Sequence, residues 1–404
     1  MSLTQAGVIG NEDIDLVAKP TRSFFQRVHK RHTPFAMEPK EIEFQTIPSF
    51  GKACTAIIPR AGDILVKLYL KVNLGPLGDG AGGSGVRYVD DVGRAMIDSV
   101  SIKAGSVTID TLYPEFMHAW EEISTPSDLH LGQATGKASD DALLEDWAKS
   151  SQHLYIPLEF YFHRHFANGL PLVSLYTTTL SVVVNFKPLD QLVSLLYKGS
   201  LDASKDGIMT AKLIGEFVTL ATPERKVFLE KRHQFIMSQV QKQHVVVKAG
   251  TTKYRVPLQF SLPCKEFIIL PIRSEELANN NWFNFKGYEE SVNGGQQDEG
   301  FHTLAISLNS CLRVQPRDPM YYRIIQNSVH HRRVPRKVIY SYSLAIEPES
   351  YDPSGSLNMS RIDDVSLEFT FSAALPSDLH FLVFARSINV FKAYAGLSSL
   401  KWAS

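Results

Sequence analysis

Three short groups of residues carry side chains that can do chemistry. His163 and His165 form an HxH pair, and on a β-strand the two imidazoles would share one face and could bind a metal ion. No cysteine or carboxylate lies at a familiar spacing to complete such a set, so we expect two surface or interface histidines. Asp90–Asp91 and Asp363–Asp364 are paired carboxylates. Because neighbouring strand residues point to opposite faces, both pairs fit solvent or turn positions better than acid–base catalysis.

Two further segments could bind anions. The glycine-rich stretch 75–85 (GPLGDGAGGSG) lacks the GK[ST] ending and the following helix of a phosphate-binding loop, so we expect a flexible hairpin tip. The run His330–Lys337 (HHRRVPRK) is the densest basic segment. It could contact nucleic acid, anionic lipid or an acidic partner, but we favour a solvated loop between strands. No candidate residues converge in sequence, and we expect neither an enzyme nor a bound cofactor or metal.

The composition of the 404-residue chain narrows its function. Lys plus Arg and Asp plus Glu both number 42, so the formal net charge is zero. A protein that wraps nucleic acid is usually basic, whereas zero net charge permits many copies to associate closely. The three cysteines, Cys54, Cys264 and Cys311, form no CxxC pair and are typical of free thiols in a reducing compartment. No signal region or long apolar run is present, so we expect a soluble protein in a cytoplasm.

Alternating hydrophobicity predicts short β-strands over most of the chain. In the clearest run, 64–74, apolar residues alternate with polar ones, except that Leu65 falls on the polar side. Residues 112–123 (LYPEFMHAWEEI) are predicted to form a short helix that begins near Pro114. Two successive cycles of about 180 residues predict an all-β fold of two tandem eight-stranded jelly rolls, with short helices in the connections.

These patterns divide the chain into three parts. We expect an N-terminal arm at 1–24, a first jelly roll at 25–210 and a second jelly roll at 211–404. The segment 21–35 (TRSFFQRVHKRHTPF) combines aromatic and basic residues. It is either a solvated segment with two anchoring phenylalanines or an arm that binds a partner.

The stretch 341–363 (SYSLAIEPESYDPSGSLNMSRID) predicts a strand, a structured loop and the approach to another strand. The strand alternation runs to about residue 346, and Asp352–Gly355 has the composition of a β-turn, with Pro353 second and Gly355 fourth. Asn358 begins an N-x-S sequon, and we interpret it first as a turn residue that bonds the backbone. We expect five fold-defining residues here, with the last three tying the loop to the sheet or to a neighbouring subunit: Pro353, Gly355, Asn358, Arg361 and Asp363.

Five separated segments resemble the major capsid proteins of nucleocytoplasmic large DNA viruses, or smaller relatives of that capsid lineage. They occur in the expected order from about residue 23 to the end of the chain. Leu262 stands where the family usually has histidine, and Leu170 where alanine is common. The segments are Phe50–Gly51 with Ile58–Asp63, Ile156–Leu158 with Gly169–Leu172, Leu262–Phe267, the stretch 341–363, and Arg386–Val390 with Tyr394–Leu397.

The resemblance implies a structural protein that assembles with itself. In this family two jelly rolls stand side by side, three chains form a pseudo-hexagonal trimer, and trimers tile an icosahedral shell over an internal membrane. It further implies contacts with neighbouring capsomers, with minor capsid and penton proteins, and with that membrane on the inner face, inside a virion assembled in the host cytoplasm. Sequence-specific binding of nucleic acid is not expected.

Jelly rolls also occur in cupin-type enzymes and in lectins, so the fold alone leaves alternatives. A cupin should carry a GxHxH cluster with a glutamate and a later histidine, and the residues around His163 and His165 do not supply one. A carbohydrate-binding, lectin-like protein is the remaining alternative. Its binding platform would be the exposed aromatic side chains of Tyr161 or of Trp282–Phe283.

Overall fold

The computed structural model describes residues 10–21, 23–26, 29–77, 87–126, 131–138, 141–194, 209–290 and 298–402. It divides into two units, residues 1–35 and residues 36–404. The first unit is longer than the arm expected at 1–24, and its described part holds η1 (Asn11–Asp13) and α2 (Ile14–Val17). Most of the glycine-rich stretch 75–85 lies outside the described residues. Within them, no helix has the length and apolarity needed to span a membrane.

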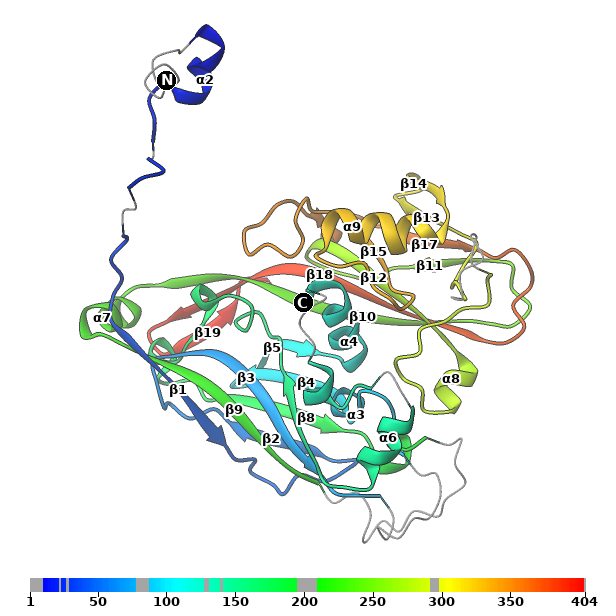
Figure 1. Ribbon diagram of the computed structural model, residues 1–404, viewed down its shortest axis with the longest axis horizontal. Coiled ribbons are helices and arrows are strands. Elements are labelled where there is room, and N and C mark those ends of the chain that lie inside the picture. Colours follow the sequence, from blue (N-terminus) through cyan, green and yellow to red (C-terminus); the bar gives the residue numbers. More distant parts are fainter. Residues whose placement is uncertain are drawn as a thin grey trace, which may run out of the picture. The chain divides into compact units, whose positions relative to one another are not determined.

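The described strands of the first roll form two antiparallel sheets (Figure 1). One sheet has the order β1-β9-β3-β6, with the short β7 beside β3, and the other has the order β2-β8-β4-β5. The bounds are β1 (Phe35–Ile42), β2 (Ala53–Ile57), β3 (Ile64–Leu74), β4 (Ile97–Ala104), β5 (Val107–Leu112), β6 (Gln152–Pro157), β7 (Leu170–Pro171), β8 (Leu180–Phe186) and β9 (Met209–Leu220).

The second roll repeats this arrangement. One sheet has the order β10-β18-β12-β15, with β16 beside β12 and β19 beside β18, and the other has the order β11-β17-β13-β14. The bounds are β10 (His233–Val247), β11 (Lys253–Pro257), β12 (Pro263–Arg273), β13 (Thr303–Leu308), β14 (Cys311–Arg317), β15 (Tyr340–Ser343), β16 (Leu357–Asn358), β17 (Val365–Thr370), β18 (Leu379–Tyr394) and β19 (Leu397–Leu400).

Both rolls have the same connectivity. When the strands of the main paths are numbered along the chain within each roll, the two sheets have the orders 1-8-3-6 and 2-7-4-5 in both cases. The first strand therefore lies beside the last, as it does in a jelly roll built from two Greek keys. The expected all-β fold of two tandem jelly rolls with helices in the connections is confirmed.

Short helices occupy the connections between the strands. The longest described helix, α4, begins at Pro114 as expected, because proline suits the first helical position. The described helices of residues 36–404 are α3 (Val92–Ala95), α4 (Pro114–Ser124), α5 (Gly132–Thr135), α6 (Asp141–Ala148), η2 (Phe166–Asn168), η3 (Leu172–Leu175), η4 (Leu189–Gln191), α7 (Thr222–Glu230), α8 (Ser274–Ala278), the π-helical η5 (Tyr321–Ile325), α9 (Gln326–His330) and η6 (Met359–Arg361).

The boundary between the rolls lies later than the expected division at 210/211. Strand β9 pairs with β3 from Ile64↔Val218 to Leu74↔Met209, and it also lies beside β1. It is the last strand of the first roll, because the jelly-roll topology returns the chain to its first strand only at the end. The second roll therefore begins after α7, with β10.

Strand β3 explains the one break in the predicted alternation. Its buried residues alternate with outward-facing Lys67, Tyr69 and Lys71, but Leu65 and Val66 are both buried. The pairing of β3 with β9 shifts register between Leu65 and Lys67, which marks a β-bulge. A bulge inserts one residue and lets two consecutive side chains face the core.

The loop after β15 differs from the prediction. The strand ends at Ser343, and Ile346 is 74% exposed. A turn forms at Glu347–Ser350, where Ser350 N donates to Glu347 O at 3.2 Å. The β-turn expected at Asp352–Gly355 is absent from these described residues. Both segments carry a turn-forming proline, and the earlier one closes the turn because Pro348 takes its second position.

Gly355 meets a different requirement from the one predicted for it. Its φ is +135°, and Ile346 N donates to Ser354 O at 3.3 Å, so the two segments run alongside each other. A Cβ atom on Gly355 would lie 3.2 Å from Leu344 O. The exposed Pro353 precedes this contact. Both the backbone conformation and the close approach therefore favour glycine.

The end of the loop is held by a short helical turn. Asn358 Oδ1 accepts a hydrogen bond from Ser360 N at 3.1 Å, the backbone contact that we expected. Ser360 Oγ accepts from Leu262 N at 2.9 Å, which ties the loop to the start of β12. Arg361 and Asp363 are exposed and have no partner among the described residues. Their contact with a neighbouring subunit stays a prediction.

Replacing Gly355 by valine should destabilise the second roll by about 1–3 kcal/mol, because a branched residue must adopt a backbone conformation that only glycine tolerates well. Urea unfolding of the purified protein measures this change. Ser356→Val is the matched control, since Ser356 is exposed and adjacent. Equal free energies of unfolding for the two variants would show that the glycine is not required.

Candidate functional site at the seam between the two rolls

Helix α4 of the first roll is buried on all sides because it packs between the two rolls (Figure 1). Every residue from Pro114 to Ile123 is buried. The Phe116 ring lies 5.6 Å from that of Phe384 on β18 of the second roll. We call the contact between the rolls the inter-roll seam. The apolar residues on both sides of it belong to one continuous core cluster.

Trp120 of α4 lies between two arginine side chains. The guanidinium carbons of Arg164 and Arg386 are 4.1 and 3.8 Å from its ring centroid. Arg164 comes from the first roll and Arg386 from β18 of the second, so the indole is shared by both rolls. Cation–π contacts of this kind are strengthened where water is excluded. Arg386 is only 2% exposed, and this charge needs a counter-ion.

Glu266 of β12 supplies that counter-ion. Its carboxylate forms an ion pair with Arg386 and lies 3.1 Å from His331 Nε2. His331 Nδ1 lies 3.1 Å from Glu349 Oε1. Burial alone would lower the pKa of His331, but the two carboxylates outweigh it and raise the pKa to about 9. Burial would raise the pKa of Glu266, but Arg386 and His331 hold it at about 2. At neutral pH these groups form a charged, buried network.

A second buried network is centred on His118 of α4. Asp91, whose φ is +53°, accepts from Arg94 Nη1 at 2.8 Å and from His118 Nδ1 at 2.6 Å. Lys337 Nζ of the second roll donates to His118 Nε2 at 2.9 Å and to Phe283 O at 3.0 Å. Burial and the Lys337 charge lower the pKa of His118 to about 3, so the imidazole is neutral. It connects Asp91 of one roll to Lys337 of the other.

Three residues of the basic run His330–Lys337, namely His331, Arg333 and Lys337, belong to the seam, whereas Arg332, Val334 and Arg336 are exposed. Arg333 N donates to Ile123 O at the end of α4 at 3.1 Å, and the Arg333 side chain lies 3.8 Å from Glu122. Together with His331 and Lys337, it faces the first roll. For these three residues the prediction of a solvated loop was wrong. The carboxylates Glu266, Glu122 and Asp90, which lie beside His331, Arg333 and Lys337, are in distant segments of the sequence and leave no local charge pattern.

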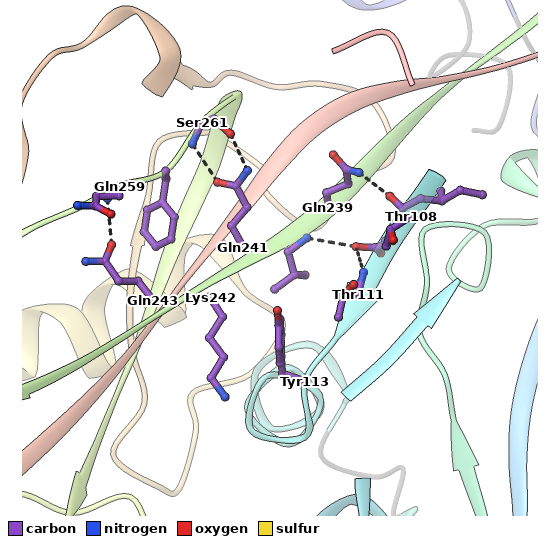
Figure 2. Close-up of a pocket in the computed structure, with 13 residues that line it drawn as sticks. Thr108, Thr111, Tyr113, Gln239, Gln241, Lys242, Gln243, Gln259 and Ser261 are labelled. Carbon is purple, nitrogen blue, oxygen red and sulfur yellow. Dashed lines mark hydrogen bonds between the residues drawn. The ribbon is translucent and has the colours of Figure 1, made fainter. Parts of the chain in front are cut away.

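The edge strands of the two rolls meet at a polar junction (Figure 2). Gln239 Nε2 of β10 donates to Ile109 O of β5 at 2.5 Å, and Val240 N lies 3.4 Å from Asp110 Oδ1. Side chains, not a shared backbone ladder, therefore join the two edges. Beside them is a cavity of about 400 Å³, bordered by Lys242, whose Nζ lies 3.0 Å from Glu115 Oε2. Burial raises the pKa of Asp110 to about 7.

The other candidate residues do not form a chemical site. His163 is held neutral, with a pKa lowered to about 4 by burial and by Lys67, and it packs against Tyr69. His165 stacks on Tyr351 instead of sharing a ligand with His163. No group of three His, Cys, Asp or Glu in the described part of the chain could hold a metal. Asp363 and Asp364 lie at the exposed end of the 341–363 loop.

Two interpretations need correction. Asp91 lies in a turn, one of the two positions expected for it, but it is fully buried in the second network and does not face solvent. The aromatic platform of a lectin is also absent at the residues suggested for it, because Tyr161 and Phe283 are 5% and 3% exposed. The Trp282 indole already makes a hydrogen bond within the chain, because its Nε1 donates to Gln191 O at 2.9 Å. These aromatic side chains pack at the seam and do not present a surface.

Glu266→Gln should cost about 3–5 kcal/mol of unfolding free energy, because it leaves Arg386 buried without its counter-ion and removes one of the two carboxylates beside His331. Denaturant titrations of the variant and the natural chain measure the loss. Asp364→Asn is the matched control: its ion pair with Arg255 is 40–50% exposed, so the cost should stay below about 1 kcal/mol. Similar small losses in both variants would contradict a structural role for the buried pair.

Asp110→Asn should remove a pH dependence from the seam. The pKa of Asp110 is raised from 3.8 to about 7 on folding, so the folded state binds the proton more tightly. The contribution of Asp110 to the free energy of unfolding is complete below pH 3.8 and is lost as the pH rises towards 7. Between pH 4 and pH 8 the free energy of unfolding of the variant should therefore rise relative to that of the natural chain, by up to about 4 kcal/mol. A stability difference that does not change with pH would contradict this assignment.

Comparison with known proteins identifies two family models that together span both rolls. The model of the large eukaryotic DNA virus major capsid protein matches residues 224–399, and that of the major capsid protein N-terminus matches residues 23–216. The gap between the matches falls at the end of β9 and the start of α7. It therefore agrees with the boundary between the rolls set by strand pairing.

Curated relatives and solved structures agree with these matches. The major capsid protein of Pyramimonas orientalis virus is 27% identical, and probable capsid protein 4 of Acanthamoeba polyphaga mimivirus is 25% identical; each alignment covers 100% of this chain and 99% of the relative. PBCV-1 VP54, fitted into a reconstruction of the virophage Sputnik, has a TM-score of 0.81 at 20% identity over 95% of this chain and 100% of its own. The Faustovirus major capsid protein has a TM-score of 0.74 at 12% identity, over 96% and 95%. The chain belongs to the major capsid protein family of large eukaryotic DNA viruses.

Proposed function

We propose that three copies of this capsid protein form a pseudo-hexagonal trimer, and that such trimers tile the icosahedral shell of a large double-stranded DNA virus. The repeated connectivity of the two rolls carries this proposal. Two similar units in each chain allow three chains to supply six similar units around one axis. Three-fold closure also leaves no free end at which chains could add indefinitely.

The inter-roll seam supports the proposal because it makes the chain a rigid building block. Buried α4 and the two charged networks fix the orientation of one roll relative to the other. A shell subunit must hold that orientation, since a wrong angle between the rolls of each chain would be repeated in every trimer of the shell. Ion pairs and hydrogen bonds are directional, whereas apolar surfaces alone tolerate sliding.

The same proposal extends to the partners of the trimer. Its neighbours would be other trimers, minor capsid proteins and penton proteins, with an internal membrane beneath the inner face and assembly in the host cytoplasm. Membership in the capsid family supports these assignments. The zero formal net charge favours contact between protein copies over wrapping of nucleic acid.

The purified protein should elute as a compact species of three times the 45.2 kDa chain mass, and electron micrographs should show particles with a hexagonal outline. Light scattering coupled to size-exclusion chromatography measures the mass. A stable monomer retained on an immobilised carbohydrate would contradict the trimer and favour the lectin-like alternative.

A further inference from the structure

We propose that a small polyphosphate anion binds in a cavity of about 410 Å³ at the inter-roll seam, where cationic side chains of both rolls surround it. Inorganic polyphosphate and the triphosphate group of a nucleotide share this chemistry, and two probes distinguish them. The proposal concerns a site within one chain, so it stands whether or not the chain forms the trimer proposed above.

Three cationic side chains line the inner part of the cavity. Arg164 comes from the first roll, whereas Lys265 of β12 and Arg386 of β18 come from the second. Lys265 and Arg386 are 3% and 2% exposed, and the Arg164 side chain is 24% exposed. A ligand held by these residues would therefore contact both rolls at once.

The carboxylates beside these cations are too few to neutralise them. Glu266 pairs with Arg386, but it is shared with the imidazolium of the first charged network. Glu159 lies 3.9 Å from Arg164, beyond hydrogen-bond distance. Lys265 forms no ion pair with a carboxylate in the described part of the chain. Because a buried cation needs a counter-charge, an anion fits among these three side chains.

The three cations also repel one another. Burial, and then the charges of Arg386 and Arg164, lower the pKa of Lys265 to about 8. Burial and the charge of Arg386 likewise lower the pKa of Arg164 to about 10. An anion placed among them would offset this repulsion and favour the charged form of each.

Several hydrogen-bond donors around the cavity have no acceptor. Arg164 Nε and Nη1, Arg386 Nε and the Tyr161 hydroxyl are buried without a hydrogen-bond partner among the described residues. No described residue accepts from Arg164 Nη2 either. Lys265 Nζ donates only to Ser350 O, at 3.4 Å. Phosphate oxygens suit such a set, because guanidinium and ammonium groups form strong charge-assisted hydrogen bonds with them.

The other carboxylates that border the cavity leave its inner wall positive. Glu349 faces Arg332 at 3.2 Å and His331 at 3.1 Å, so its charge is already neutralised. Burial raises the pKa of Asp110 to about 7, so much of this carboxyl is protonated at neutral pH. Asp352 is exposed, and solvent ions screen its charge. A multivalent anion therefore meets more positive than negative charge at the inner wall.

The size and the rim of the cavity suit a chain of phosphates better than a single one. Its volume of about 410 Å³ falls within the range of small-molecule sites and corresponds to roughly a dozen waters. At the rim, Tyr351 is 38% exposed and stacks on His165 at a centroid distance of 5.2 Å. This aromatic surface offers a stacking position for the base of a nucleotide.

Calorimetric titration of the full-length protein with inorganic triphosphate, at constant ionic strength in chloride and without divalent cations, tests the site. Lys265→Met should weaken binding at least tenfold, because it removes a cation that no carboxylate neutralises. Lys226→Met is the matched control, since Lys226 is exposed on α7 and does not line the cavity. Its affinity for triphosphate should equal that of the natural chain.

The unfolding midpoint supplies a readout that a merely structural lysine would not give. Without triphosphate, Lys265→Met should melt at or above the temperature of the natural chain, because methionine fills the space without the charge repulsion. At about one hundred times the dissociation constant, triphosphate should raise the midpoint of the natural chain by about 3 °C and leave that of Lys265→Met unchanged. Lys265→Gln, which keeps a donor for Ser350 O, repeats the test with a polar side chain.

Adenosine triphosphate separates the two sources of the anion. Equal affinities for it and for inorganic triphosphate would assign the site to the phosphate chain alone. A tighter affinity that Tyr351→Ala reduces to the value of inorganic triphosphate would assign the site to a nucleotide. Either result supports the proposal when the Lys265 variants lose binding and Lys226→Met retains it.

Two results would overturn the proposal. The first is a natural chain that binds neither triphosphate. The second is an equal affinity in the Lys265 variants and in Lys226→Met, because the anion would then bind elsewhere on the surface.

Discussion

Arg386 brings a positive charge into the space between the two rolls, and the surrounding structure must compensate for it. An unpaired charge at that depth would cost several kcal/mol, so Glu266 on the neighbouring strand must remain beside it. Glu266 also faces His331, and Trp120 of the first roll covers the guanidinium. One buried ion thereby fixes two strands and a loop of the second roll relative to a helix of the first. The orientation of the two rolls depends on this contact.

The two networks of the seam meet α4 at residues only two positions apart. The first holds Trp120 through charges that remain ionised, whereas the second uses neutral His118 to connect Asp91 with Lys337. A cavity of about 410 Å³ borders the first network, with Arg386 and Glu349 in its lining. Charge in this molecule serves to fix geometry, which is the property that a repeated shell subunit requires. Polar edge contacts between β5 and β10 complete the same seam.

Local patterns predicted the elements, but not how they pack together. Alternation identified β3, Pro114 marked the start of α4, and two cycles of strands indicated two rolls, because each of these signals lies within a few adjacent residues. The division at 210/211 was wrong, since nothing local shows that β9 pairs back with β1. The seam was also missed. Glu266 and Arg386 interrupt apolar strands, which was an available signal, but their partners lie in distant segments that the sequence alone does not bring together.

The burial of α4 also constrains how the protein is made. During synthesis the first roll is complete while β10 and β18 are still unformed, so the apolar face of α4 stays uncovered. The second roll of any neighbouring chain presents the same surface and could capture it, giving a swapped assembly. The short connection through α7 opposes this exchange, because it holds the correct roll at a high effective concentration. Fidelity of the shell thus begins with a nine-residue helix that lies between the rolls in sequence.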